Sequence, residues 1–337
     1  MQNKVFVGMS GGVDSSVAAA ILLEKGYQVE GISLVLTENQ EKAGISDAQA
    51  VADALSIPLH VFDMKKEFAE SVIANFISEY RAGRTPNPCI VCNERIKFGL
   101  MLDKSLEMGS DFLATGHYAK IEKEDDRFLL KAADSVKDQS YFLYRLNQNQ
   151  LSHILFPIAD MEKEDTREIA RKLGLPVAEK SDSQEICFVP DDDYVKFLKE
   201  FANVESTPGN FVNLDGEVIG EHKGIINYTI GQRKGLGAFG EPMFVTKIDA
   251  KTNEVVLAPN GFQDTSEFVV DNLSEPLTSE CKLDVKIRYK ANRVPASIIP
   301  FDNKVKVVFD VPQRAVTPGQ SAVFYDGDTV VSGGYIV

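Results

Sequence analysis

The sequence has no apolar run approaching eighteen residues, so it predicts no membrane-spanning helix and no membrane partner. It holds only four cysteines among 337 residues, and its first strand begins at Lys4, which leaves no room for a signal peptide. We therefore expect a cytoplasmic protein without structural disulfides. Basic residues are also few: 36 Lys and Arg stand against 50 Asp and Glu, a formal net charge of −14. This charge argues against a general polyanion binder, because phosphate contacts need Lys and Arg.

Two stretches depart from the acidic total. Residues 282–293 contain five basic residues and one acidic residue, and residues 81–97 contain four basic residues and one acidic residue. A nucleic acid, if one binds, would be held at such patches.

The first part of the chain alternates short apolar strands with helical segments. The expected strands span residues 4–9, 28–36, 59–63 and 111–115, and the expected helices residues 17–23, 48–55 and 68–80. This alternation predicts an α/β fold with a parallel sheet covered on both faces. From residue 128 to about residue 201 the pattern becomes mixed and mostly helical, with a clear helix at 163–173.

After residue 205 the periodicity changes to two. Turn residues at 214–217, 250–253 and 325–328 separate alternating segments and predict hairpins. We expect an α/β domain with a mixed, mostly helical part at 1–202, a small β domain at 203–270 and a β-barrel at 271–337; the family resemblance given below implies that the first of these is catalytic and that its helical part binds tRNA.

The stretch from Lys4 to Ser16, KVFVGMSGGVDSS, joins a predicted buried strand to a helix. Paired glycines allow a tight turn with inward N–H groups, and the helix N-terminus adds unpaired N–H groups and a positive dipole end. Serine hydroxyls can bind phosphate oxygens, and Asp14 can hold Mg²⁺. The loop lacks the Lys of a Walker motif and the spacing of a dinucleotide fold. The alternative is an ordinary Gly-Ser turn between strand and helix.

The SGGVDSS string resembles the PP-loop of the ATP pyrophosphatases, which split ATP between its α and β phosphates to adenylate a carbonyl oxygen. In parallel sheets the ligand lies beyond the carboxyl ends of the strands, where Leu34 and Gly116 also belong. For Gly116 the alternative is a strand-ending turn. The resemblance implies ATP and Mg²⁺, with ATP held by Gly8, Met9, Ser10, Gly11, Gly12, Val13, Asp14, Ser15, Leu34 and Gly116.

Cys89 and Cys92 form a C-x-x-C motif before a helix predicted to start near Asn93, and Cys187 lies in DSQEICFV. No second C-x-x-C or H-x-H is present to complete a zinc site, and the motif does not follow the first strand of a thioredoxin-type fold. A carbonyl-activating loop together with thiols favours thiolation. A thiolate near a helix N-terminus has a lowered pKa and is the reactive form.

Strings along nearly the whole chain are similar to the tRNA-specific 2-thiouridylase (MnmA) family, which replaces the 2-oxygen of the wobble uridine, position 34 of tRNA, by sulfur. They are GMSGGVDSS, GRTPNPCIVCNERIKF, ATGHYAKI, KDQSYFLY, SDSQEICF, GEHKGIINYTIGQRKGLG, IRY and VTPGQSAVFYDGD. The resemblance implies a PP-loop parallel-sheet (adenine nucleotide alpha hydrolase-like) domain, a small β domain and a C-terminal β-barrel.

The resemblance also implies a reaction cycle. The uridine O2 attacks the α-phosphate of ATP bound with the help of Asp14, and a Cys187 persulfide then attacks C2. Cys92 acts as the second nucleophile and ends in a disulfide with Cys187. A reductant and a sulfur-donor protein, a cysteine desulfurase or a relay, are therefore expected partners besides tRNA.

Further residues match tRNA contacts of this family. They are Asn87, Pro88 and Cys89 at the target base, Lys137, Asp138 and Gln139 before an aromatic run, and Arg288 and Tyr289 in the barrel. For residues 137–139 the alternative is a capped helix start, and for the aromatic residues after them we expect burial in the core.

One position departs from the family pattern, because many relatives have Asp where this chain has Cys89. Cys89, Cys92 and Cys187 could instead ligate an iron–sulfur cluster, which is the alternative to the persulfide route. Two other functions compete with thiolation: another PP-loop ligase, such as an amidating synthetase, and an RNA-binding module without catalysis.

Overall fold

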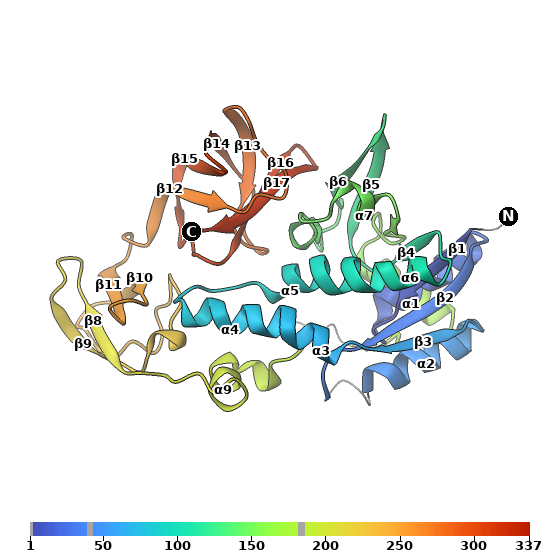
Figure 1. Ribbon diagram of the computed structural model, residues 1–337, viewed down its shortest axis with the longest axis horizontal. Helices are drawn as coiled ribbons and strands as arrows, with labels where there is room; N and C mark the ends of the chain where they lie inside the picture. The colour runs from blue at the N-terminus through green and yellow to red at the C-terminus, as the bar shows by residue number, and fades with distance from the viewer. Residues whose placement is uncertain (1–2, 39–42, 181–185) are drawn as a thin grey trace. The chain divides into compact units, whose positions relative to one another are not determined.

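The computed structural model describes residues 3–38, 43–180 and 186–337 of the chain (Figure 1). The chain forms two compact units. One comprises residues 1–72, 89–184 and 327–330, and the other residues 73–88, 185–326 and 331–337. Among the described residues, no helix is long and apolar enough to cross a membrane.

The first unit contains a five-stranded parallel sheet. Its strands are β1 (Lys4–Gly8), β2 (Gln28–Val35), β3 (Leu59–Asp63), β4 (Phe112–Ala114) and β7 (Ile154–Leu155). They lie in the order β3-β2-β1-β4-β7, and every neighbouring pair is parallel. The predicted α/β sheet is thus confirmed. The order reverses between β1 and β4, and such a switch point is where open parallel sheets bind ligands.

Helices cover both faces of this sheet (Figure 1). Val5 and Val7 pack with α1 (Val13–Glu24) and α2 (Ala43–Leu55), whereas Phe6 packs with η3 (Cys92–Met101) and α6 (Leu102–Glu107). Successive side chains of a strand point to opposite faces, so burial on both faces explains an unbroken apolar run.

The prediction of mostly helix from residue 128 to 201 is wrong. β5 (Ala119–Glu124) and β6 (Arg127–Ala132) form an antiparallel hairpin, and turns connect the short helices that follow. The helical elements are η4 (Ser140–Phe142), α7 (Gln148–Leu151), α8 (Lys163–Lys172), η5 (Pro190–Asp192) and α9 (Tyr194–Glu200). The side chains of Tyr141 and Tyr144 are buried as predicted, whereas that of Phe142 is only partly buried.

Two predicted helices begin earlier than expected. The cysteine helix begins with α5 (Pro88–Val91), before Asn93, and continues without a break through η3 and α6. Proline suits the first helical position, because its missing N–H would lack an intrahelical partner there in any case. The helix predicted at 68–80 runs from α3 (Lys65–Phe68) through η2 (Ala69–Ile73) to α4 (Ala74–Arg81).

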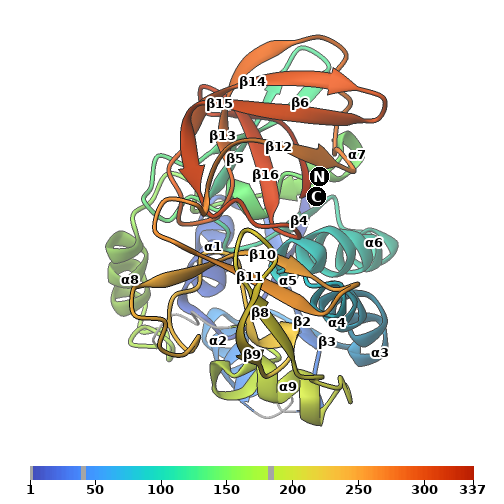
Figure 2. The same ribbon diagram turned by 90° about the vertical axis from the view of Figure 1, so that its left-hand side faces the viewer.

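The second unit contains two β structures, and the three predicted hairpin turns fall between strands. A four-stranded sheet has the order β10-β11-β8-β9, formed by β8 (Gly209–Val212), β9 (Val218–His222), β10 (Met243–Asp249) and β11 (Glu254–Pro259). The short helix η6 (Ile225–Asn227) follows β9. The remaining strands are β12 (Asp264–Asp271), β13 (Cys281–Lys286), β14 (Val294–Phe301), β15 (Lys304–Arg314), β16 (Ser321–Asp326) and β17 (Thr329–Ile336). Pairing of β12 with both β15 and β17 closes them into the expected barrel (Figures 1 and 2).

Candidate active site

The glycine–serine loop lies at the carboxyl end of β1, at the switch point of the sheet. Gly11 adopts a φ of +68°, which favours glycine, and α1 begins two residues later at Val13. The hydroxyls of Ser15 and Ser16 donate to the carbonyl oxygen of Gly12, whereas the Ser10 side chain is exposed. The loop therefore presents a glycine-rich backbone and one exposed hydroxyl at the start of a twelve-residue helix.

Gly116, directly after β4, touches this loop. A Cβ at Gly116 would lie 2.6 Å from the carbonyl carbon of Asp14 and 2.6 Å from the backbone nitrogen of Ser15. Leu34, near the end of β2, is partly buried and packs against the core around Phe6. The structure thus brings the loops after β1 and β4 into contact, while the Leu34 side chain contributes to packing.

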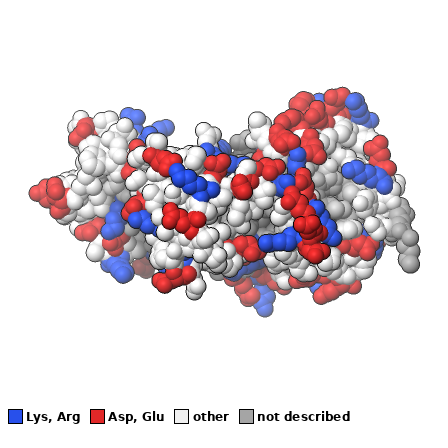
Figure 3. All heavy atoms as spheres, turned by 90° about the horizontal axis from the view of Figure 1, so that it is seen from above, with Lys and Arg blue, Asp and Glu red and all other residues white. Residues whose placement is uncertain are grey.

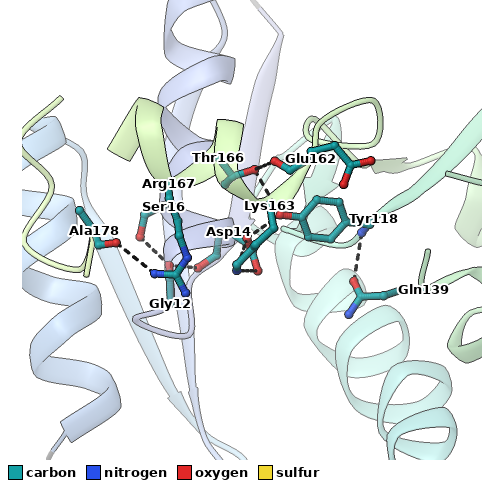
Figure 4. Close-up of polar contacts among 11 residues, drawn as sticks. Gly12, Asp14, Ser16, Tyr118, Gln139, Glu162, Lys163, Thr166, Arg167 and Ala178 are labelled. Carbon is teal, nitrogen blue, oxygen red and sulfur yellow. Dashed lines mark hydrogen bonds and ion pairs between the residues drawn. The ribbon is translucent and has the colours of Figure 1, made fainter. Parts of the chain in front are cut away.

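The Asp14 carboxylate is held by two side chains from other parts of the chain (Figure 4). The Lys163 ammonium, at the start of α8, lies 2.8 Å from each Asp14 oxygen, and the Tyr118 hydroxyl donates to Oδ1 at 2.8 Å. Tyr118 is itself within 3.2 Å of Thr166 Oγ1. No local sequence pattern links Lys163 or Tyr118 to Asp14, because 149 and 104 positions separate them from it.

Another cation contacts the loop at Gly11. Lys180 donates to the carbonyl oxygen of Gly11 at 2.9 Å and forms an ion pair with Asp47 of α2 at 2.6 Å. In Figure 4, Arg167 of α8 extends beside the start of α1 and donates to Ala178. Positive side chains therefore surround a loop whose own sequence contains none, which suits a polyphosphate ligand.

The residues of the loop fit a magnesium–nucleotide complex. Asp14 supplies the hard oxygen ligand that Mg²⁺ prefers, and Gly116 leaves an approach that a methyl group would fill. Lys163 occupies both oxygens of this carboxylate in the described structure, so the ion pair has to open before Asp14 can ligate Mg²⁺.

The cysteine helix places its two thiols in different surroundings. The Cys92 side chain is buried, whereas the Cys89 side chain reaches the surface. The surrounding protein nevertheless shields the Cys89 thiol from water. This desolvation raises the pKa of the thiol, and the positive charge of Lys97 offsets only part of the effect. The reactive thiolate expected near a helix N-terminus is thus not favoured at Cys89.

Hydrogen bonds attach this helix to the aromatic segment that follows residue 139. The Asn93 amide donates to the carbonyl oxygen of Phe142 at 3.2 Å, and Glu94 pairs with Arg145 at 2.7 Å. Asn93 is buried and its Oδ1 atom accepts no hydrogen bond from the described residues. These contacts hold the buried Cys92 on a rigid support.

His117 is a further candidate that the sequence analysis left without a role. Its Nδ1 atom lies 2.8 Å from Thr115 Oγ1, and its ring packs against Phe98 and Phe156. Burial, helped by the charge of Lys97, holds the pKa of His117 well below its usual value. A neutral imidazole therefore stands directly after β4, beside Gly116.

Cys187 lies in the second unit, one residue beyond Ile186, and residues 181–185 before them are outside the described residues. Its side chain is exposed, and its neighbour Phe188 is buried against Phe76 and Phe197 at centroid distances of 5.2 and 5.3 Å. The aromatic cluster fixes the backbone beside an accessible sulfur atom.

Asp138 and Gln139 have well-defined contacts within the first unit. Asp138 accepts hydrogen bonds from the backbone N–H groups of Ala133 and Ser140, and Gln139 exchanges two hydrogen bonds with Tyr118. Lys137 is half-buried in the same turn. Asp138 and Gln139 thus stabilise the turn that carries Tyr118, and none of these contacts tests a role in binding RNA.

Arg288 also forms contacts within its own unit. Its guanidinium donates to the carbonyl oxygen of Ala315 and to Thr317 Oγ1, while the Lys286 ammonium lies 5.5 Å from the ring centroid of Tyr289. The segment after Thr317 binds the backbone of Thr85 through Pro318 and Gln320. Arg288 therefore stabilises the barrel loop that binds the irregular segment leading to Asn87 and Pro88.

Within the described residues, no group of three or more Cys, His, Asp or Glu side chains is arranged to hold a metal ion. The iron–sulfur alternative consequently gains no support from the structure.

Comparisons with known proteins agree along the whole chain. Family models described as the tRNA methyl transferase HUP domain, the tRNA methyl transferase PRC-barrel domain and the aminomethyltransferase beta-barrel domain match residues 3–191, 195–259 and 265–336. A protein of Acetivibrio thermocellus named tRNA-specific 2-thiouridylase MnmA is 51% identical over 99% of both chains. A protein of the same name from Clostridium beijerinckii is 47% identical over 100% of this chain and 99% of its own. A solved 4-thiouridine synthetase–RNA complex with bound ATP is similar only at a TM-score of 0.39, with 16% identity over 55% of this chain and 45% of that chain.

Proposed function

Because the chain belongs to the tRNA-specific 2-thiouridylase MnmA family, we propose that it is a tRNA sulfurtransferase that replaces the O2 atom of the wobble uridine by sulfur at the expense of ATP. The observation that carries the proposal is the glycine–serine loop at the switch point, with Asp14, Lys163 and Lys180 around it. The methyl transfer named in the family-model descriptions would need neither this phosphate-binding loop nor the thiols of Cys92 and Cys187.

In the proposed cycle, the loop backbone and Ser10 bind the ATP phosphates. Mg²⁺, held by Asp14, would neutralise phosphate charge. The uridine O2 attacks the α-phosphorus, a P–O bond forms and pyrophosphate leaves. Lys163 is released from Asp14 when the phosphates arrive, and its ammonium then stabilises the negative charge that develops on the pyrophosphate.

Sulfur transfer follows in two steps. The terminal sulfur of a Cys187 persulfide attacks C2 of the adenylated uridine, and AMP leaves with the original oxygen. The Cys92 thiolate then attacks the Cys187 sulfur, which releases 2-thiouridine and leaves a Cys92–Cys187 disulfide. A two-electron reductant regenerates both thiols, and a sulfur-donor protein restores the persulfide. This chemistry suits a reducing compartment such as the cytoplasm.

Mass spectrometry of nucleosides tests the proposal directly. A tRNA transcript incubated with the protein, ATP, Mg²⁺, a sulfide source and a thiol reductant should contain 2-thiouridine, and pyrophosphate should appear in equal amount. Asp14→Asn should abolish both products while leaving the fold intact, and Asp103→Asn, at an exposed position on α6, is the matched control. Methylated nucleosides formed with a methyl donor, in the absence of thiolated ones, would refute the proposed reaction.

A further inference from the structure

A cavity of about 460 Å³ in the second unit has no part in the proposed chemistry. It is lined by Gly231, Arg233, Pro242, Phe244, Asn260 and Arg314. No carboxylate belongs to this lining, although acidic residues outnumber basic ones in the chain. Its volume is within the range of sites that bind small molecules or parts of larger ligands.

The polar groups of this cavity are donors. Arg233 and Arg314 are exposed, and within the described part of the chain neither forms a salt bridge to a carboxylate. The side-chain oxygen of Asn260 accepts a hydrogen bond from Gln263 at 3.0 Å, so the Asn260 NH₂ group is the one left to donate into the cavity. Two guanidinium groups and an amide NH₂ form a donor set for a tetrahedral oxyanion.

The framework of the cavity is rigid. Gly231 has a φ of +85°, and a Cβ at this position would lie 2.7 Å from the Ala315 Cβ. The Gly231 N–H donates to the carbonyl oxygen of Val245, and the Ala315 N–H donates to that of Gln263. The Arg314 guanidinium lies 5.2 Å from the ring centroid of the buried Phe244. Arg288, which holds the Ala315 carbonyl group, therefore also fixes the residue next to Arg314.

An exposed aromatic ring lies in the same loop as Asn260. The Phe262 side chain is 59% exposed, whereas its neighbour Gln263 is buried. Arginines together with an exposed aromatic ring are a common combination at RNA-binding sites, because an unpaired base stacks on the ring while the backbone phosphate binds the arginines. On the face shown in Figure 3, basic side chains lie scattered among acidic ones and form no broad positive area.

We propose that Arg233, Arg314 and Asn260 bind a backbone phosphate of the tRNA substrate and that Phe262 stacks on an adjacent base. The inference rests on the proposed function, which supplies tRNA as the partner. It places tRNA contacts at residues other than Arg288 and Tyr289. The two arginines hold one phosphate between them, which anchors the RNA without reading its sequence.

The test measures the affinity of the full-length protein for an unmodified tRNA transcript at several salt concentrations. Arg314→Ala and Arg233→Ala should each weaken binding about tenfold, as expected for a lost hydrogen bond to a charged group. The double variant should lower the salt dependence by roughly one phosphate contact. Lys234→Ala is the matched control, because Lys234 is exposed beside Arg233 but does not line the cavity. Phe262→Ala should weaken binding without changing the salt dependence.

The outcomes separate this inference from the proposed function. Unchanged tRNA affinity in the double variant, with normal thiolation, would overturn the phosphate site and leave the function standing. Weakened affinity in the double variant, with normal pyrophosphate release at saturating tRNA, supports the site as an anchor outside the chemistry. Competition by inorganic phosphate without any change in tRNA affinity would identify a free anion as the occupant and would refute the RNA contact. A wild-type protein that binds no tRNA would overturn both proposals.

Discussion

The Lys163 ammonium lies 2.8 Å from both carboxylate oxygens of Asp14, across 149 positions of sequence. The pair is only partly exposed, with 16% of the Lys163 side chain and 30% of the Asp14 side chain accessible. Each charge therefore compensates the other before a nucleotide arrives. In a magnesium–nucleotide complex, Mg²⁺ would compensate the charge of Asp14 and the phosphates would compensate that of Lys163. The pair can therefore separate without leaving either charge uncompensated.

Lys163→Met should lower ATP-dependent pyrophosphate release by about 10²-fold, because loss of a preorganised positive charge at a departing phosphate has an effect of this size. Steady-state release of pyrophosphate with saturating tRNA measures it. Lys172→Met, at the other end of α8, removes an exposed charge paired with Glu168 and should have no effect. An unaltered rate in Lys163→Met would mean that the ammonium serves only to stabilise Asp14 in the folded chain.

The three thiols should respond differently to replacement by serine. Cys92→Ser and Cys187→Ser should each stop multiple turnover, since a hydroxyl can neither accept nor hold sulfane sulfur. Cys89→Ser should have a mild effect, because the raised pKa of the Cys89 thiol keeps it protonated near neutral pH and disfavours a role as nucleophile. Counting 2-thiouridine per enzyme over several cycles distinguishes these results. Equal loss in all three variants, in a protein whose activity follows its iron content, would instead support a cluster.

Arg288→Ala should reduce stability as well as RNA binding. The substitution leaves Thr317 and the Ala315 carbonyl group without their guanidinium donor, at a cost of about 1–3 kcal/mol. Thermal unfolding measures the first effect and a tRNA titration the second. If the melting temperature is unchanged while the salt dependence of binding falls, Arg288 acts directly on the RNA.

Acid should destabilise the protein through its buried histidines. Burial lowers the pKa of His222, and His117 has a pKa well below its usual value, which is about 6.5 in an unfolded chain. As the pH falls below about 6.5, these histidines become protonated in the unfolded chain but stay neutral in the folded chain. Their contribution to stability is therefore complete above that pH and decreases below it. Calorimetric melting from pH 8 to pH 5 should show the decline, and His117→Asn should flatten it. A melting temperature that rises toward pH 5 would contradict this assignment.

The structure of His222 gives the physical reason for its part in this effect. Its Nδ1 atom accepts a hydrogen bond from the Gly224 N–H at 3.0 Å, and its Nε2 atom lies 3.1 Å from the carbonyl oxygen of Asn253. This pattern assigns the neutral tautomer with the proton on Nε2. Protonation of Nδ1 would break the hydrogen bond from Gly224.

Local signals in the sequence were sufficient for four of the five strands of the parallel sheet and for the barrel, but not for β7. Short β-branched strands, a glycine–serine turn and hairpin turns each specify structure within about ten residues, so these elements follow from the pattern alone. The β5–β6 hairpin was missed because its exposed half, Glu122 to Arg127, is rich in charged residues and lacks apolar alternation. Propensity is a weak guide where tertiary pairing decides the conformation.

The cations around the loop could not be predicted in the same way. Lys163 and Lys180 come from segments far from Asp14 and Gly11 in sequence, and neither belongs to a motif with a fixed spacing. Arg288 shows the converse difficulty. Its place in a basic stretch predicts a surface contact, yet its guanidinium is directed at a backbone carbonyl group in its own barrel. The sequence gives the charge of a side chain, whereas the fold determines which groups that charge contacts.

The tight contact at Gly116 has a consequence for directed evolution. In a library randomised at position 116 and selected for activity, glycine alone should survive, because even a methyl group would meet the main chain of Asp14 and Ser15 at 2.6 Å. A library at Gly26 should behave differently: its φ is +82°, but no atom of the described residues lies within 4 Å of an added Cβ, so asparagine and aspartate should be recovered beside glycine. Position 116 should therefore reject other residues because of their volume, whereas position 26 should reject most of them because of its positive φ.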